Sequence, residues 1–198
     1  MAQTMHEVLH SWLDNGTRHT TPDVNIESLA DTVPQFDPDD YLRTCPPNDI
    51  LVDTVLTTDT SIYASGDVLA DQQNVIDALR ISGGRAILQS VEIIDHDNQA
   101  GALDLIFLAS GMSIGVENST AAVTGSILKH VVAIVPVASA NYVAMGGAQV
   151  AIKGIADLGF VVTGNQWSKD LYVAAVSRDT KTYSATGLEL KTGFTLRN

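Results

Sequence analysis

The chain has 198 residues, 45% of them hydrophobic, and a formal net charge of −12 at pH 7. It is long enough to form one domain with a sizeable core, and too hydrophobic to be disordered throughout. The negative charge argues against nucleic-acid or anionic-membrane partners, because both kinds of binding depend on lysine and arginine side chains. The sequence contains no run of about 18 apolar residues, so we expect no transmembrane helix. The N-terminal sequence MAQTMHEVLH lacks the basic flank and apolar core of a signal peptide, so we expect a protein made and assembled in a cytosol.

Residues 1–49 differ in composition from the rest of the chain. They contain five of the six prolines, and their nine acidic and two basic residues give a charge of −7. Residues 50–198 carry the other −5, from fourteen acidic and nine basic residues. We therefore predict an N-terminal arm over 1–49 and a folded domain over 50–198.

The arm begins with a pattern that is typical of a short amphipathic helix. Thr4 and Glu7 fit a capping box, in which each side chain satisfies a free backbone N–H group at the helix start. The apolar residues of one helical face are Met5, Val8, Leu9, Trp12 and Leu13. Because a helix this short is marginal alone, this face must pack on its own domain or on a neighbouring chain, and the sequence leaves both alternatives open.

After this helix the chain is polar and proline-rich as far as residue 48. A long segment without regular structure is uncommon inside a compact domain, so we interpret it as an arm or a binding segment. Its acidic side chains include Asp37, Asp39 and Asp40, which suit a basic partner surface. The single cysteine, Cys45, has no metal-type cysteine spacing around it, and we interpret it as an ordinary linker residue.

From residue 50 onward the pattern is that of β-structure. Short apolar runs alternate with clusters of Gly, Asn, Asp and Ser, which predicts an all-β sandwich or barrel. Pro136 indicates an edge strand or a bulge, because proline cannot donate to a ladder. The segment 67–77 also fits a helical turn. The predicted strands are Ile50–Thr58, Ile62–Leu69, Asn74–Ile81, Arg85–Asp95, Ala102–Ala109, Met112–Val116, Ser126–Pro136, Tyr142–Lys153, Phe160–Val162, Leu171–Val176 and Leu188–Leu196.

Two of these strands are expected to be central because both of their faces are apolar. Arg85–Asp95 and Ala102–Ala109 are separated by a polar segment rich in turn residues, so we predict a hairpin. Strands that are apolar on both faces lie in the middle of a layered structure or beneath another subunit. We therefore place this hairpin at the centre of a β-sandwich.

One catalytic motif occurs in the arm. His6-Glu7-Val8-Leu9-His10 matches the H-E-x-x-H pattern of zinc proteases, in which two histidines bind Zn²⁺ and the glutamate acts as general base. His19 is a candidate third ligand. However, only five residues precede the motif, and Leu13 and Gly16 replace the glycine and histidine of the extended pattern. A zinc protease is therefore only a remote alternative.

Other candidate sites are weaker. Asp95, Asp97, Asn98 and Gln99 resemble part of a calcium loop, but Ala100 and Ile106 replace the required glycine and glutamate, which favours a plain hairpin turn. No phosphate-binding glycine loop or nucleophile elbow is present, so we predict no cofactor and no catalytic site. The larger aromatics suit core or interface packing better than a sugar-binding surface; they are Trp12, Trp167, Tyr142, Tyr172 and Tyr183.

The segment Asp67–Ser110 resembles a group of tailed-phage virion proteins. Two sequence motifs carry this resemblance. They are S-G-G-x-x-x-L-Q-S-V-x-I-I-D-x-D-x-Q at Ser82–Gln99 and the apolar run Leu103–Phe107. The pattern extends over about residues 60–180 but does not include the arm. The resemblance implies a small β-sandwich or jelly-roll module, often trimeric, that decorates or cements a capsid.

These observations predict a phage decoration protein, a non-enzymatic homotrimer that binds the major capsid protein on the outer surface of the virion. Met5, Val8, Leu9 and Trp12 are the expected arm anchors, and Asp37, Asp39 and Asp40 are expected to face a basic capsid patch. The alternative is a tail or fibre component, or a module that binds host glycans through aromatics and Asn/Asp loops.

Overall fold

The computed structural model describes residues 35–36, 42–43, 49–154 and 158–197. The chain divides into two compact units, Met1–Pro46 and Pro47–Asn198. In the first unit, β1 (Gln35–Phe36) pairs antiparallel with β2 (Leu42–Arg43). The predicted amphipathic helix of the arm lies outside the described residues.

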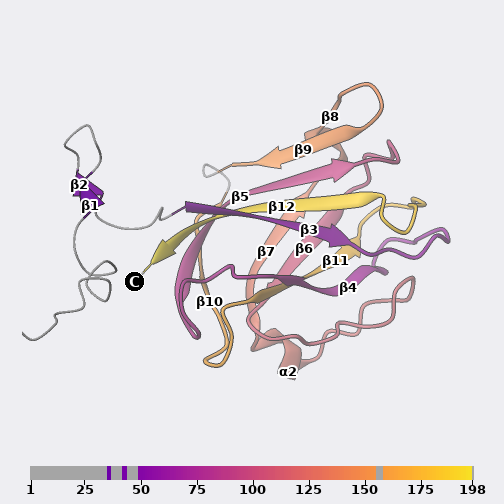
Figure 1. Ribbon diagram of the computed structural model, residues 1–198. Helices are drawn as coiled ribbons and strands as arrows, with labels where there is room; N and C mark the ends of the chain where they lie inside the picture. Colours follow the sequence, from indigo (N-terminus) through magenta and orange to yellow (C-terminus); the bar gives the residue numbers. More distant parts are fainter. Residues whose placement is uncertain (1–34, 37–41, 44–48, 155–157, 198) are drawn as a thin grey trace, which may run out of the picture. The chain divides into compact units, whose positions relative to one another are not determined.

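The second unit is a β-sandwich, as the sequence predicts, and Figure 1 shows its two sheets. All strand pairs within the sheets are antiparallel. The six-stranded sheet has the order β3 (Asp49–Leu56), β12 (Leu188–Arg197), β5 (Arg85–Asp95), β9 (Gln149–Lys153) and β8 (Tyr142–Ala144), and β10 (Phe160–Thr163) pairs with the first half of β5. The four-stranded sheet has the order β4 (Val68–Val75), β11 (Leu171–Ser177), β6 (Leu103–Leu108) and β7 (Val131–Val137).

The order of the strands is that of a jelly roll. Counting β3, β4, β5, β6, β7, β9, β11 and β12 as one to eight, one sheet reads 1-8-3-6 and the other reads 2-7-4-5. The chain therefore crosses between the sheets after almost every strand, which is the double Greek key of jelly-roll domains. The jelly-roll alternative of the predicted fold is confirmed.

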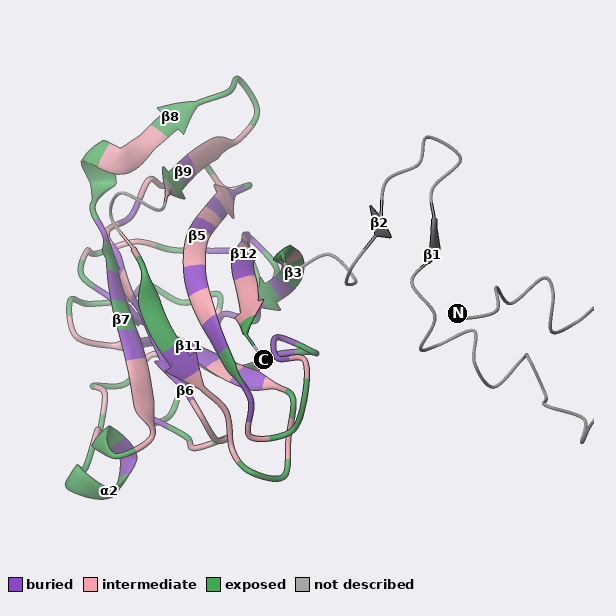
Figure 2. Ribbon diagram, turned by 90° about the vertical axis from the view of Figure 1, so that its left-hand side faces the viewer, coloured by how far each residue is buried: buried purple, intermediate pink, exposed green. Residues whose placement is uncertain are grey.

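The core lies between the two sheets, and its side chains come from alternate positions of the strands. Figure 2 shows this alternation along β5, where buried and half-buried residues follow one another. The largest fully buried side chains include Tyr63, Phe107 and Phe194. A two-residue period with one face inward is what a two-layer antiparallel structure requires.

The predicted hairpin between residues 85 and 109 is wrong, although both strands are central. β5 lies between β12 and β9 in one sheet, whereas β6 lies between β11 and β7 in the other. The turn carries the chain across the sandwich. It is closed by Asp95, which is fully buried and accepts hydrogen bonds from the backbone N–H groups of Asp97 (3.0 Å), Gln99 (2.7 Å) and Ala100 (2.7 Å). The pattern of apolar residues does not distinguish two strands paired as a hairpin from two strands in opposite sheets. In either arrangement, each strand buries one face in the core.

Three other strand predictions also change. Residues 67–77 form no helical turn, because β4 runs from Val68 to Val75 and replaces parts of two predicted strands. The predicted strand Tyr142–Lys153 is two strands, β8 and β9, and Gly146 and Gly147 lie in the turn between them. Pro136 does lie on an edge strand, β7. Residues 112–116 form a loop instead of a strand.

This loop belongs to a longer segment that covers the outer face of the four-stranded sheet. It includes α2 (Gly125–Leu128), a single helical turn whose Ile127 is buried, and Ile114, which is fully buried. Both residues pack with Ile106 and Leu108 of β6 in a second apolar cluster. β6 is therefore apolar on both faces because it has a core on each side. Within the described residues, no helix is long and apolar enough to cross a bilayer.

Candidate functional site

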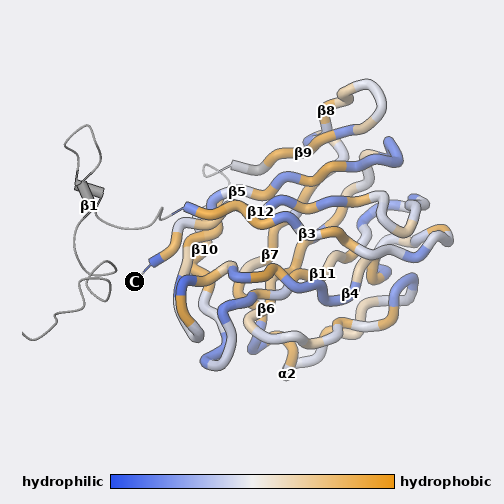
Figure 3. The backbone as a smooth tube through the Cα atoms, in the orientation of Figure 1, coloured by the Kyte–Doolittle hydropathy of each residue, from blue (hydrophilic) through white to orange (hydrophobic). Residues whose placement is uncertain are grey.

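The outer face of the six-stranded sheet presents apolar side chains to solvent. Val143 of β8, Val150 of β9 and Ile94 of β5 are direct neighbours in one cross-strand row, and Ile152 lies two residues along β9. Val143 is 62% exposed and Ile152 is 63% exposed. We call these four residues the outer apolar patch. Figure 3 shows that the middle of β9, Val150–Ile152, is hydrophobic, between the polar Gln149 and Lys153 at its ends.

The same face continues toward β3 with charged and apolar side chains mixed. Glu92, Glu189 and Lys191 separate the outer apolar patch from the exposed Leu51 and Val55 of β3. A hollow of about 340 Å³ lies over Gly193 and is lined by Asp49, Ile50, Leu51, Gln89, Ser90, Gly193 and Phe194. Contiguous apolar side chains with a charged margin are typical of a protein-binding surface.

A second candidate site lies on the four-stranded sheet, over β4 and β11. Two residues of β4, Asp71 and Gln72, stand opposite the single Ala174 of β11, so β4 contains a β-bulge. Bulges redirect side chains and are frequent beside binding sites. The Asp71 carboxylate accepts a hydrogen bond from the backbone N–H of Ile114 (2.9 Å), which holds the loop after β6 against this bulge.

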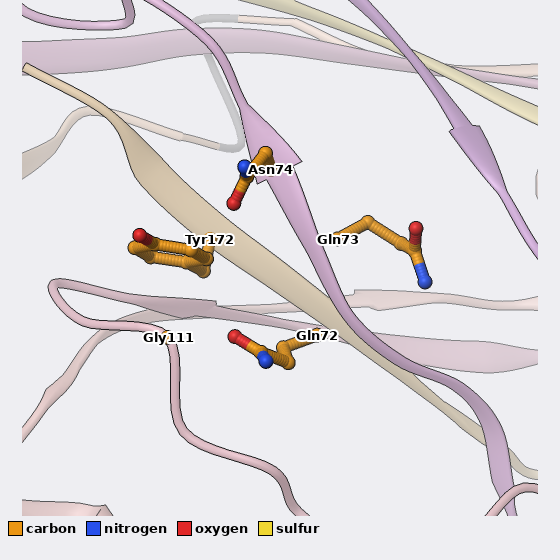
Figure 4. Close-up of a pocket in the computed structure, with 5 residues that line it drawn as sticks. All are labelled: Gln72, Gln73, Asn74, Gly111 and Tyr172. Atoms are coloured by element: carbon orange, nitrogen blue, oxygen red, sulfur yellow. The ribbon is translucent and has the colours of Figure 1, made fainter.

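The bulge and the loop enclose a recess of about 530 Å³ that we call the amide pocket. It is lined by Gln72, Gln73, Asn74, Gly111 and Tyr172. Figure 4 shows the side chains of Gln72 and Asn74 on the same side of β4 as the Tyr172 ring, while Gln73 points the other way. A Cβ atom at Gly111 would come within 2.5 Å of Gln72 Oε1 and 2.9 Å of the Tyr172 ring. A side chain at position 111 would therefore push the Gln72 amide and the Tyr172 ring aside, and glycine avoids this displacement.

The Gln72 side chain has unused hydrogen-bonding capacity. Its Oε1 atom is buried and has no hydrogen-bond partner among the described residues. An unpaired buried amide oxygen costs about 1–3 kcal/mol, so its retention calls for an explanation. None of the five lining residues carries a charge, and the side chains of Gln72, Asn74 and Tyr172 offer amide donors, amide acceptors and one aromatic ring. This combination suits a neutral ligand with hydroxyl groups.

The predicted aromatic residues do not gather on the surface. Tyr183 is buried, and its ring centroid lies 6.4 Å from that of Tyr63 in the core. Trp167 is 81% exposed in the loop between β10 and β11, and Tyr172 lines the amide pocket. Core packing therefore accounts for Tyr183, as predicted, and Tyr172 is the aromatic residue that lies at a candidate site.

Burial of tyrosine hydroxyls makes the fold sensitive to alkaline pH. Burial raises the pKa of Tyr63 to about 12, and it also raises the pKa of Tyr142 and Tyr183, with Asp95 contributing in both. The Tyr63 hydroxyl donates to the Leu69 carbonyl (3.1 Å) and accepts from the Asp59 N–H group. Because these phenols stay neutral in the folded state to a higher pH than in the unfolded chain, they stabilise the fold fully only below the unfolded pKa.

We therefore expect the melting temperature to fall as pH rises from about 10 to about 12, because the unfolded state then loses protons that the folded state keeps. Thermal unfolding followed by circular dichroism over this range measures the effect. Tyr63→Phe should show a shallower fall than wild type, whereas Ile62→Ser, which changes the exposed residue beside it, should follow wild type. A melting temperature that stays level to pH 12 would contradict the expectation.

In the turn that resembles part of a calcium loop, two carboxylates accept hydrogen bonds from other groups of the protein. Asp95 closes the turn, and the Asp97 carboxylate accepts from the Ser184 backbone N–H (2.6 Å) and from its hydroxyl (2.9 Å). Both carboxylates are therefore used within the turn, but the turn crosses between the two sheets and is not the hairpin turn that the sequence favours. In the described part of the chain, no three His, Cys, Asp or Glu residues are grouped so that they could hold a metal ion.

The predicted arm residues all lie outside the described residues. These are Met5, Val8, Leu9, Trp12, Asp37, Asp39 and Asp40, together with the H-E-x-x-H motif at His6–His10. Their roles stay predictions. Neither the outer apolar patch nor the amide pocket was identified from the sequence. The only available signal for the pocket is the polar run Gln72-Gln73-Asn74 inside an otherwise apolar strand.

Comparison with known proteins adds little. No protein-family model matches the chain, and no curated protein matches it in sequence. A structure titled Desmodium yellow mottle tymovirus aligns with 82% of this chain and 86% of its own, at 12% sequence identity and a TM-score of 0.26. A superposition this poor transfers neither a fold nor a role. The strand order itself is informative, because jelly rolls occur in viral capsid proteins, lectin domains and cupins, but a shared fold does not fix the function.

Proposed function

We propose that the protein is a structural component of a virion, a phage decoration protein that binds the outer surface of a capsid and stabilises it. The outer apolar patch carries this proposal. Contiguous exposed apolar side chains on a sheet face are typical of a surface that another protein covers, and in a virion this would be a neighbouring chain. The jelly-roll order and the resemblance of Ser82–Gln99 to tailed-phage virion proteins support it. The proposal assigns no catalytic step to the chain.

The mechanism is mass action. A protein that binds the assembled shell and not its dissociated subunits stabilises the shell by about 3 kcal/mol at a hundredfold excess over its Kd. A homotrimer at a three-fold position of the shell would strengthen weak contacts through avidity. In this proposal the major capsid protein covers the outer apolar patch, and the acidic arm residues Asp37, Asp39 and Asp40 meet a basic patch on it.

The test is co-sedimentation of the purified protein with capsids assembled in its absence. We expect the double variant Val143→Ser/Ile152→Ser to lose at least about tenfold in affinity for the capsid. Each replacement removes an apolar side chain that would be buried when the protein binds. The control is Ile62→Ser/Val116→Ser, which changes two equally exposed apolar residues on loops. It should bind like wild type.

Light scattering on the free protein completes the test. A small oligomer that binds capsids agrees with a decoration protein. Closed shells formed by the protein alone would overturn that role and indicate a shell-forming subunit instead. Equal affinity of the patch variant and wild type would show that the outer apolar patch is not the contact.

A further inference from the structure

The amide pocket lies on the four-stranded sheet, so the contact proposed for the six-stranded sheet leaves it unused. It is a built feature: a β-bulge directs Gln72 outward, Asp71 fixes the loop after β6, and Gly111 lets this loop approach the Tyr172 ring. A recess left by chance between strands would need none of these three features.

We propose that the amide pocket binds a neutral sugar ring. Primary amides donate and accept at once, so the Gln72 and Asn74 side chains match neighbouring hydroxyl groups on a pyranose. The Gln72 Oε1 atom is buried and lacks a partner within the described part of the chain, and a rotation of the amide group toward the recess would let it accept a hydrogen bond from a sugar hydroxyl. The Tyr172 ring offers an apolar surface for the C–H face of the same sugar.

Charge and size define the ligand further. The lining residues carry no charged side chain, so an anionic sugar such as a sialic acid would have no counter-charge there. The volume of about 530 Å³ falls within the usual range of small-molecule sites and accommodates a mono- or disaccharide. An open site with few polar groups predicts weak binding, with a Kd on the order of 1 mM.

The experiment is an NMR titration of the full-length, ¹⁵N-labelled protein. The probes are methyl α-glucoside, methyl α-mannoside, methyl β-galactoside and N-acetylglucosamine, with glycerol as a polyol that has no ring. We expect at least one sugar to shift the backbone amide signals of residues 72–74, 111 and 172, while glycerol leaves them in place. Tyr172→Ala should weaken the binding at least tenfold. Gln89→Ala, a matched amide change on the other sheet, should leave it unchanged.

The proposal is overturned if no sugar shifts these signals, if glycerol shifts them equally, or if Tyr172→Ala binds as tightly as wild type. If the spectrum of Tyr172→Ala shows loss of folding, Asn74→Ala replaces it, because this exposed position is not part of the core. Capsid co-sedimentation is a separate measurement on another surface. Either proposal can therefore fail without the other.

Discussion

Replacing Asp95 with alanine should destabilise the protein by at least about 3 kcal/mol, because the turn after β5 depends on this one carboxylate. The carboxylate is fully buried and accepts three backbone N–H groups from the turn that follows β5. Alanine would leave those donors without a partner, at about 1–3 kcal/mol each. Urea denaturation of wild type and variant measures the difference in the free energy of unfolding.

Two further variants make the Asp95 experiment specific. Asp95→Asn keeps one acceptor oxygen and the side-chain volume, so we expect a smaller loss than for alanine. His96→Ala changes the next residue, whose half-exposed ring reaches only Glu189 at 3.5 Å, and should stay within about 0.5 kcal/mol of wild type. A loss below about 1 kcal/mol for Asp95→Ala would show that water or a shifted turn satisfies the three donors.

Phe107→Ala should cost about 3–5 kcal/mol, because it removes a large side chain from the centre of the core and leaves a cavity. Phe107 is fully buried on β6, directly opposite Val173 of β11 and Ala133 of β7. Small residues on both sides leave little material that could collapse into the space. The free energy of unfolding from urea denaturation again measures the effect.

The control for Phe107 lies on the neighbouring strand. Ile134 follows Ala133 on β7 but points out of the core and is 47% exposed. We expect Ile134→Ala to cost less than about 1 kcal/mol. Similar losses in the free energy of unfolding for Phe107→Ala and Ile134→Ala would contradict this burial of the inner faces of β6 and β7.

Much of the fold follows from local sequence pattern. β5 has the predicted bounds Arg85–Asp95, and β6, β10, β11 and β12 lie within two residues of prediction. These strands are apolar runs bounded by turn residues, and their period of two survives in any antiparallel arrangement. β4 was predicted poorly because Asp71-Gln72-Gln73-Asn74 breaks the apolar pattern in the middle of a strand.

The sites were less predictable than the strands. The amide pocket joins residues from β4, β11 and the loop after β6, which are up to 100 positions apart in the chain. The outer apolar patch joins β5 with β8 and β9, and its residues are ordinary valines and isoleucines. Nothing in a strand sequence says which of its two faces will be left without a cover.

Local sequence pattern is enough to give the all-β class, the composition boundary near residue 49 and most strand positions, because these depend on hydrophobic period and turn residues within short windows. Three features emerge only when the strands pair: the turn at Asp95 crosses between sheets, β6 has a core on both faces while β9 has one on a single face, and a bulge in β4 opens a polar pocket. Strand pairing couples residues far apart in the chain, and the free energy of that pairing depends on which faces meet, so no local window contains the answer.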